Sequence, residues 1–533
     1  MKLYLSVAMI FLVFGAVLLV SPFGTVAFSD GEVFFGTTLG RIAHLFLGGA
    51  FLFACFQVPY TCRVIYWVLG GGVSLVVVHV VIALQQLFAP SWEWVPLHGA
   101  RVYGGFYQPN VLASFIATGL ALALMLFLLP GFVLARAQYE RCRQAGLVML
   151  LVVFCALLVW GQSRAGQLGG LAVAILFLWR FGRVFSRGCA VAAGAMLFGV
   201  LLGWGVMLSG DSLVVAIIHE HSNQARWTMF RDTLAMIAEK PLLGWGYGSF
   251  EYNFQHFRIN QTPPTVVTEI ARHPHNEILL WWVEGGVVGL AGMVLIVLGG
   301  IRVVRQCVRH DHVAVAAGLR RAGVPTALCI ALVPMTIHTQ LEFPFYLSTQ
   351  HFAMFLLLLA MADRLSGGAM VRRPLPPVAS VVLAGAMPAL ALGVAVIAGF
   401  AFKGSQVIAE VERFGMEDVT PLKEMPALSR WWHLERVVFD EQVNALLTYN
   451  HTGDEQLLED YSQWAQRYLQ RRIDKNVYAS LIQILRHQEQ DLVAEQYRRD
   501  AVRLFPKDRR FVSTQDSNSG QAIVNNNPQL EAL

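Results

Sequence analysis

Charged side chains are scarce in this sequence, and their scarcity excludes most soluble folds. Only 14% of the 533 residues are Asp, Glu, Lys or Arg, whereas 56% are hydrophobic and the mean hydropathy is +0.52. Soluble domains carry about 25% charged residues. The composition therefore predicts an all-α, polytopic membrane protein. A formal net charge of +5 implies little by itself, and nothing in the sequence indicates a nucleic-acid partner.

Cysteine is also rare, and the few cysteines avoid the loops expected outside the cell interior. The seven are Cys55, Cys62, Cys142, Cys155, Cys189, Cys307 and Cys329. All fall in apolar runs or in the loops assigned below to the cytoplasm, so no disulfide framework is predicted. Simple scarcity of cysteine explains the pattern equally well.

Complete motifs for metals and nucleotides are missing too. His219-Glu-His221 and His273-Pro-His275 each offer two histidines, but no His-Glu-x-x-His motif occurs and neither neighbourhood has a strand pattern. The alternating glycines that begin at Gly244 follow no strand and precede no Lys-Ser/Thr, which argues against a nucleotide P-loop. A membrane-interface loop with aromatic anchors fits them better. We therefore expect no metal and no cofactor.

Long apolar runs, in contrast, are abundant, and about eleven are long enough, or nearly so, to cross a bilayer. They cover residues 3–20, 43–58, 64–88, 111–134, 146–160, 166–181, 189–208, 276–300, 324–341, 349–362 and 379–402. The first run follows Lys2 and lacks a small-x-small cleavage site, so we interpret it as a retained span.

Arginines gather in alternate loops and so predict the orientation of the chain. They are Arg136, Arg141 and Arg143 after the fourth run, Arg180, Arg183 and Arg187 after the sixth, Arg302, Arg305, Arg309, Arg320 and Arg321 after the eighth, and Arg364, Arg372 and Arg373 after the tenth. We assign this side and the N-terminus to the cytoplasm. Residues 89–110, the turn at Ser163, residues 209–275, residues 339–348 and everything after Lys403 then face the other side.

These assignments predict three regions. Residues 1–402 form a transmembrane domain with a large outer loop at 209–275, which is too long to be a mere connection. Residues 403–511 have the charge-rich composition of a soluble helical domain, and the stretch from Ala494 to Ala501 is similar to the second helix of a tetratricopeptide hairpin. A generic helical bundle is an equal alternative. Residues 512–533 are polar enough to be disordered.

The stretch from Arg272 to Leu290 passes from ionisable groups into the eighth run. His273, His275 and Glu277 should therefore lie where a span meets water. Pro274 suits the first turn of a helix, whose free N–H groups would favour an anion and keep a nearby histidine neutral. Glu277, Trp281 and Glu284 share one helix face and could line a cavity. His275 is the candidate general base; a structural interfacial histidine is the alternative.

Further polar groups precede or interrupt other runs. Arg101, Tyr107 and Gln108 could present donors to a sugar or phosphate, or their segment could be only a loop in which Asn110 caps the next helix. Arg164 is either a pyrophosphate clamp or an arginine that reaches the interface. Glu342 either marks a span boundary or orients a catalytic group.

At this point the sequence resembles a known family. His275-Asn276 followed by Glu284-Gly285-Gly286 is similar to a motif of the O-antigen ligase and polymerase superfamily. Within it, Gly104 to Ala113, with Gln108-Pro-Asn110, resembles the signature of bacterial protein O-oligosaccharyltransferases, which glycosylate pilins. His338 to Tyr346 and the C-terminal helices are similar to the extra region of those enzymes.

The resemblance implies an inverting, metal-independent glycosyltransferase of the GT-C type. Such an enzyme lies in the bacterial inner membrane and moves a glycan from undecaprenyl pyrophosphate to a Ser or Thr hydroxyl in the periplasm. It would give the catalytic role to His275. Glu277, which departs from the commonest form of the motif, is a second catalytic candidate that either modifies the base or only caps the helix. The pyrophosphate-binding arginines would be Arg164 and either Arg226 or Arg231, and Tyr107 and Gln108 would belong to the ligase-specific site. The further candidates for substrate binding, chosen from their positions in the sequence, are Arg101, Asn276, His338 and Glu342.

Three readings of the function follow. The first is protein O-glycosylation, with a pilin as the acceptor and the C-terminal domain helping to recognise it. The second is O-antigen ligation to lipid A-core, or glycan polymerisation. The third is a lipid-glycan flippase or transporter, which should show internal repeats and broken helices that we do not see clearly. In each reading the partners are a lipid-linked glycan and membrane lipids.

Overall fold

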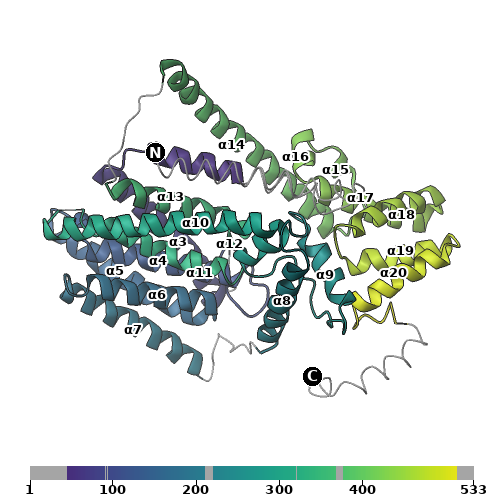
Figure 1. The fold of residues 1–533 in the computed structure, drawn as a ribbon, viewed down its shortest axis with the longest axis horizontal. Coiled ribbons are helices and arrows are strands. Elements are labelled where there is room, and N and C mark those ends of the chain that lie inside the picture. Colours follow the sequence, from purple (N-terminus) through teal and green to yellow (C-terminus); the bar gives the residue numbers. More distant parts are fainter. Residues whose placement is uncertain are drawn as a thin grey trace. The chain divides into compact units, whose positions relative to one another are not determined.

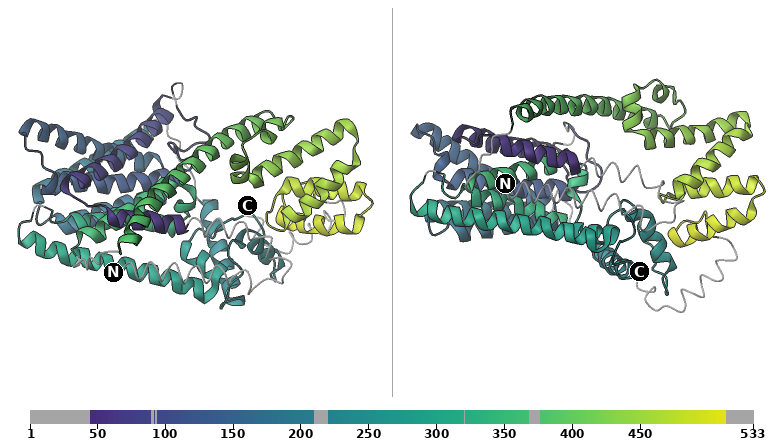
Figure 2. Two further views of the ribbon diagram at one scale, coloured as in Figure 1. Left: turned by 90° about the horizontal axis from the view of Figure 1, so that it is seen from above. Right: turned by 45° about the horizontal axis from the view of Figure 1, so that its top comes forward.

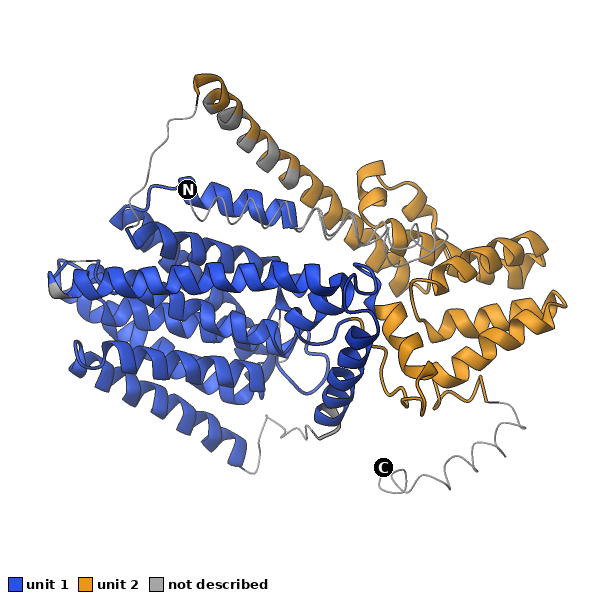
Figure 3. Ribbon diagram, in the orientation of Figure 1, with its two compact units in different colours: residues 1–31, 35–250, 273–371 blue, residues 32–34, 251–272, 372–533 orange. Residues whose placement is uncertain are grey.

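The computed structural model describes residues 45–89, 92, 94–209, 220–319, 321–367 and 376–512, and every regular element in these ranges is a helix (Figure 1). Contacts divide the chain into two units, coloured separately in Figure 3. The described parts of residues 35–250 and 273–371 belong to the first unit, and residues 251–272 and 376–512 belong to the second. The run at 3–20 lies outside the described residues.

The first unit is a bundle of apolar helices. It contains a helix over Leu45–Gln57 and then α3 (Cys62–Phe88), α4 (Pro109–Leu128), the 3-10 turn η2 (Pro130–Phe132), α5 (Ala137–Trp160), α6 (Arg164–Phe181), α7 (Ser186–Leu208), α8 (Glu220–Glu239), α10 (Glu277–Ala316), α11 (Val324–Thr339), α12 (Pro344–Leu347) and α13 (Thr349–Leu365). Figure 2 shows the long α10 running along the bundle.

The predicted spans agree with these helices. Each run that lies in the described residues coincides with a helix, and five helices, α3, α4, α5, α7 and α10, are long and apolar enough to cross a bilayer by themselves. The run at 146–160 belongs to a longer helix, because α5 has 24 residues and begins with polar turns. The chain is therefore an all-α, polytopic membrane protein.

Helix α4 is the centre of the bundle. Of its most apolar 18 residues, 94% are buried inside the structure, as expected of a helix that is hydrophobic on all sides. Small residues let α6 approach it closely: a Cβ on Gly166 would lie 2.3 Å from that of Ala113. Backbone contact of this kind is how membrane helices associate without a hydrophobic driving force. It fixes the ends of α4 and α6, which carry several candidate site residues.

Helix α10 is kinked where a glycine-rich loop crosses it. Gly286 has φ 57° and ψ −151°, a conformation open essentially to glycine alone. Its missing side chain makes room for the loop, since a Cβ there would lie 2.2 Å from the Leu242 carbonyl oxygen. The Trp245 and Gly246 N–H groups donate to the carbonyls of Val283 and Glu284. The glycines that begin at Gly244 therefore serve backbone packing against α10.

The second unit contains α9 (Phe250–Asn260) beyond its first residue, α14 (Pro377–Arg413), α15 (Thr420–Lys423), α16 (Ala427–Trp432), α17 (Leu434–Thr452), α18 (Glu455–Leu469), α19 (Lys475–His487) and α20 (Asp491–Leu504). Each helix from α17 to α20 packs on the next, an arrangement typical of helical repeats. The run at 379–402 lies in α14, so the division of the chain falls before this helix rather than after residue 402. Of the predicted disordered tail, only Val512 is described.

Part of the outer loop packs with the C-terminal helices. Ile259 and Val267 are buried in one cluster with Leu481. Arg472 donates to Glu251 at 2.8 Å and to Glu435 at 2.8 Å. Residues 251–272 are therefore a component of the second unit, although the sequence predicted a loop of the membrane domain.

We predict that Gly286→Ala destabilises the protein by about 2 to 4 kcal/mol, because the new methyl group forces a glycine-only conformation and displaces the loop at Leu242. Gly299→Ala in the same helix is the control. Apart from its chain neighbours and the backbone of its own helix, no described atom lies within 4 Å of a Cβ added there, so this variant should be neutral or stabilising. Thermal unfolding of the purified proteins measures the difference, and equal melting temperatures would contradict the prediction.

Candidate functional site

His275 lies in a strained backbone immediately before α10. Its φ is +53°, in the left-handed region that non-glycine residues seldom adopt. Its Nδ1 atom is buried and has no hydrogen-bond partner among the described residues. The helix begins at Glu277 with Asn276 as its N-cap, so Pro274 precedes the helix instead of occupying its first turn as we expected. Backbone strain around an unpartnered nitrogen is typical of a functional group.

The surroundings of His275 keep it neutral. Burial, the largest cause, and the positive charge of Arg226 both lower its pKa, which is about 4. The carboxylate of Glu342 acts in the opposite direction. The neutrality that we predicted from a helix N-terminus therefore comes from burial and from an arginine.

Glu277 forms its histidine contact with His273 rather than with His275. Its carboxylate lies 3.2 Å from Nε2 of His273 and accepts hydrogen bonds from Trp281 at 2.9 Å and Tyr346 at 2.8 Å. The contact with Trp281 confirms that these two residues share one face of α10. Glu277 thus holds a neighbouring ring in place, and its catalytic role stays a prediction.

Asn276 and Glu284 support the backbone around the site. Asn276 caps α10 by accepting from Leu279 at 3.0 Å, and its amide donates to the Gln340 carbonyl at 3.2 Å. The carboxylate of Glu284 accepts from the Phe250 N–H at 3.2 Å and is fully buried. Asn276 therefore joins the start of α10 to the loop that carries Glu342.

Glu342 is the centre of the polar site. Its side chain is 4% exposed and pairs with Arg226 at 2.9 Å. Gln108 donates to it at 3.2 Å, Asn110 donates to its other oxygen, and Nε2 of His338 lies 3.2 Å away. Burial alone would raise the pKa of Glu342, but the hydrogen bonds of His338 and Asn110 and the charge of Arg226 lower it below its usual value.

Three arginines gather around this carboxylate. Arg101 donates to Asn110 at 2.9 Å, and Arg164 donates to Asn223. Burial lowers the pKa of Arg101, Glu342 raises it, and the nearby charges of Arg226 and Arg164 lower it further. The Glu342 carboxylate therefore pairs with Arg226 and lies near Arg101, and Arg164 lies near Arg101 in turn. The excess positive charge suits an anion such as a phosphate.

Arg231 and Arg226 lie on different faces of α8. Five residues correspond to a rotation of about 140° around a helix. Arg231 pairs with the buried Asp232 at 2.9 Å, and its side chain is 60% exposed. The geometry favours Arg226 over Arg231 as the arginine that faces His275.

Tyr107 and Gln108 lie immediately before α4, in the segment from Gly104 to Ala113. Tyr107 has φ +55°, is 66% exposed and stacks on Tyr103 with ring centroids 5.3 Å apart. Gln108 caps α4 by accepting from the Asn110 N–H at 2.8 Å, so the capping role that we gave to Asn110 was wrong. The amide of Asn110 is thereby left to join Arg101 to Glu342.

A buried hydrogen-bonded chain leads from Glu342 into the bundle. Nδ1 of His338 lies 2.7 Å from Oγ of Ser114, which lies 3.1 Å from Nε2 of His351. Nδ1 of His351 lies 3.0 Å from Oγ of Ser348.

Sequence reasoning missed the roles of Ser114 and His351. A signal existed for Ser114, which lies four residues after Asn110 on the same face of an otherwise apolar helix. His351 was visible as a polar residue within a span, but no pattern identified its partner, which is distant in sequence.

No group of three or more His, Cys, Asp or Glu side chains that could hold a metal is found in the described part of the chain. His273 and His275 have ring centroids 6.5 Å apart and nearly perpendicular planes. His273 contacts Glu277 and His275 contacts Phe343 instead, while Glu342 acts on His275 through its charge.

Comparison with known families agrees with this arrangement. The family model described as O-antigen ligase matches residues 147–294, and the one described as the C-terminal part of a virulence-factor membrane-bound polymerase matches residues 326–518. The chain belongs to the O-antigen ligase and polymerase superfamily. The first match contains Arg164, Arg226 and His275, and the second contains His338 and Glu342. No match was found among curated proteins.

Membership of the ligase and polymerase superfamily gives the site its general chemistry. This superfamily consists of glycosyltransferase-like ligases and polymerases that use lipid-linked glycans in a membrane. A half-buried neutral histidine beside clustered arginines is consistent with glycan transfer from such a lipid. The identity of the acceptor requires a separate argument.

We predict opposite shifts in the titration of His275 in two variants of this superfamily member. Arg226→Gln removes a positive charge and should raise the pKa of His275 above about 4, whereas Glu342→Gln removes a negative charge and should lower it. Only the neutral imidazole reacts with diethyl pyrocarbonate, so the pH at which labelling of His275 is lost should rise in the first variant and fall in the second. Tandem mass spectrometry distinguishes His275 from His273, and shifts in the same direction would contradict the prediction.

We also predict that Ser114→Ala destabilises the protein by about 1 to 3 kcal/mol, because it deprives two buried histidine nitrogens of a partner. Thr118→Val, one turn along α4, is the matched control. The Thr118 hydroxyl is buried and has no hydrogen-bond partner in the described part of the chain, so its removal should cost nothing. Thermal unfolding tests the pair, and an equal loss in both variants would show that the chain stabilises nothing.

Proposed function

We propose that this protein is a protein O-oligosaccharyltransferase. It transfers a glycan from undecaprenyl pyrophosphate to a Ser or Thr hydroxyl of a pilin at the periplasmic face of the inner membrane. One observation carries the proposal: a neutral His275, whose Nδ1 atom has no hydrogen-bond partner among the described residues, lies beside the cluster formed by Arg226 and Glu342. A proton acceptor and an anion-binding group are thus placed together.

The reaction requires one bond to form and one to break. The acceptor oxygen attacks the anomeric carbon, and its proton passes to the free Nδ1 of His275. The bond between the anomeric carbon and the phosphate oxygen breaks, and the lipid pyrophosphate leaves with the electron pair. Attack from the opposite face inverts the configuration. The lipid carries the activated leaving group, so this scheme uses no nucleotide or metal.

The arginines stabilise the charge that develops on the leaving group. Arg101, Arg164 and Arg226 outnumber the single carboxylate of Glu342. Fixed positive groups in a site of restricted water access stabilise such charge strongly. Arg226 is also 32% exposed, so it can contact a ligand while it keeps its ion pair.

Binding of the donor also strengthens the base. A histidine with a pKa of about 4 is neutral at physiological pH but accepts protons weakly. The negative pyrophosphate would partly neutralise Arg226 and raise the pKa of His275 toward the value best suited to proton transfer. Binding of the donor would thus prepare His275 to accept the proton.

Two features favour a protein acceptor. The Gln108-Pro-Asn110 motif contacts Glu342 directly, and it is the part of the sequence that resembles protein O-oligosaccharyltransferases. The second unit supplies a row of soluble helices, α17 to α20, and helical repeats of this kind present surfaces that bind polypeptides. The match with the C-terminal part of a membrane-bound polymerase favours glycan polymerisation as the second candidate.

The test is intact-mass analysis of pilin from cells that express the wild type or His275→Asn. Asparagine tolerates the left-handed backbone at φ +53°, so this variant removes the base without adding strain. Loss of general-base catalysis should reduce glycan transfer at least about 100-fold. His312→Asn near the far end of α10, with an exposed side chain, is the matched control and should retain activity.

Protein levels in the membrane and melting temperatures are compared first, so that a folding defect is recognised. Unmodified pilin with altered lipopolysaccharide in cells that express the wild type would instead support the ligase or polymerase reading. Full activity of the His275→Asn variant would remove His275 as the base.

A further inference from the structure

A cavity lies at the end of the bundle opposite to His275. Its volume is about 740 Å³, and residues from the end of α4, the first turns of α5 and the first turns of α7 line it. The candidate site lies at the first residues of α4, and the 20 residues of this helix span about 30 Å. The cavity is therefore separate from the candidate site.

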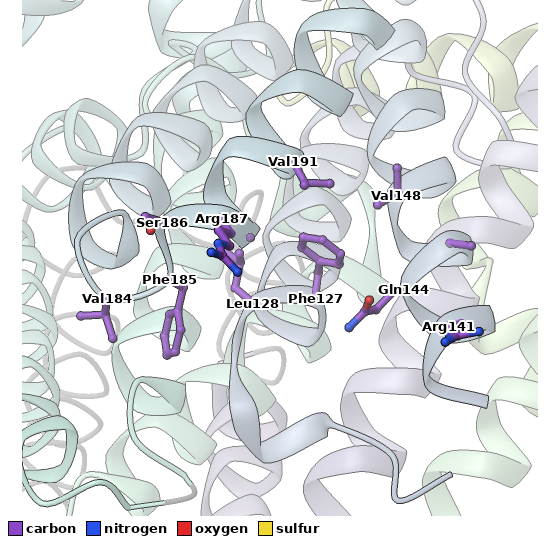
Figure 4. Close-up of a pocket in the computed structure, with 12 residues that line it drawn as sticks. Phe127, Leu128, Arg141, Gln144, Val148, Val184, Phe185, Ser186, Arg187 and Val191 are labelled. Atoms are coloured by element: carbon purple, nitrogen blue, oxygen red, sulfur yellow. The ribbon is translucent and has the colours of Figure 1, made fainter. Parts of the chain in front are cut away.

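The cavity combines an apolar wall with two cations. Phe127, Leu128 and Val148 form part of the wall, and Arg141 and Arg187 come from different helices. Figure 4 shows the two arginines on either side of Phe127 and Leu128. Val191, also in the lining, is 51% exposed, so the cavity reaches the molecular surface.

Among the described residues, no acidic side chain lines the cavity. Glu140, the acidic residue of the first turn of α5, is held by Arg143 at 2.5 Å and accepts from Gln144 at 2.7 Å and from the Leu134 N–H at 2.9 Å. Arg183 in the turn before α7 adds another exposed cation. Arg141 and Arg187 therefore face the cavity with their positive charge available.

The start of α7 adds to the same potential. Phe185 is the N-cap and supplies no side-chain acceptor, so the N–H groups of the first turn of α7 keep their partial positive charge beside the cavity. This contribution is small compared with two full charges. It has the same sign.

We propose that this cavity binds an anionic phospholipid of the cytoplasmic leaflet. The phosphate would lie between Arg141 and Arg187, and the acyl chains would follow the apolar wall past Val191. The arginine distribution predicts that this end of the bundle is cytoplasmic. Basic pockets between membrane helices on that side are suited to anionic headgroups. An apolar wall favours a lipid over free phosphate.

The experiment uses the full-length protein in a neutral detergent and native mass spectrometry. Phosphatidylglycerol and phosphatidylcholine with identical acyl chains are the two probes, and inorganic phosphate is a third. We expect phosphatidylglycerol to bind more tightly than phosphatidylcholine, and millimolar inorganic phosphate not to displace it. Equal binding of the two lipids, or displacement by phosphate alone, would overturn the proposal.

Variants locate the site. Arg141→Gln with Arg187→Gln should weaken phosphatidylglycerol binding roughly 30-fold, since each arginine near a phosphate contributes about 5-fold, and should leave phosphatidylcholine unchanged. Arg302→Gln with Arg305→Gln in α10 removes the same charge elsewhere and should change little. An equal loss in this control would mean general attraction rather than a site.

A second variant keeps the test independent of charge and of folding defects. Val191→Trp adds an aromatic ring at the exposed rim and should fill the cavity without removing an arginine. Weaker phosphatidylglycerol binding with an unchanged melting temperature in the absence of lipid is expected. Undiminished binding would place the lipid elsewhere and overturn the assignment.

Discussion

A single buried carboxylate, Glu342, holds the polar site together. It accepts hydrogen bonds from the start of α4 and from α8, and it lies within hydrogen-bond distance of the end of α11. Three arginines cannot remain close in a partly buried site without a negative charge between them. Because the carboxylate is almost fully buried, its charge is screened little by solvent. The arrangement of the three segments thus depends on one ionised group.

The membrane core gives this group a rigid support. Ala113 lies against Gly166 at backbone distance, and Ser114, the next residue of α4, joins the histidines. Packing and hydrogen bonding therefore act on the same turn of the helix. Sites built on well-packed helices keep their geometry better than sites built on loops. The outer loops supply reactive groups, while the bundle sets the positions of their partners.

The sequence predicted most of the helices and much of the site. Apolar length identified the spans, and the Gln108-Pro-Asn110 and Glu342 segments were recognised as polar interruptions of apolar runs. The partners were harder to predict. Ser114 and His351 are 237 residues apart, and no periodicity in one segment reports on another so distant. The neutrality of His275 was expected from a helix end, but it arises from burial and Arg226, which only the folded chain brings together.

The Gly244 and Gly286 contact has a consequence for how the sequence can change. A Cβ on Gly244 would lie 2.6 Å from the Gly286 nitrogen, so the two backbones occupy each other's side-chain space. Once one glycine is replaced and the backbones have separated, replacing the other should cost less than it would alone. The effects of the two substitutions are then not additive. The two positions are therefore expected to change together or not at all.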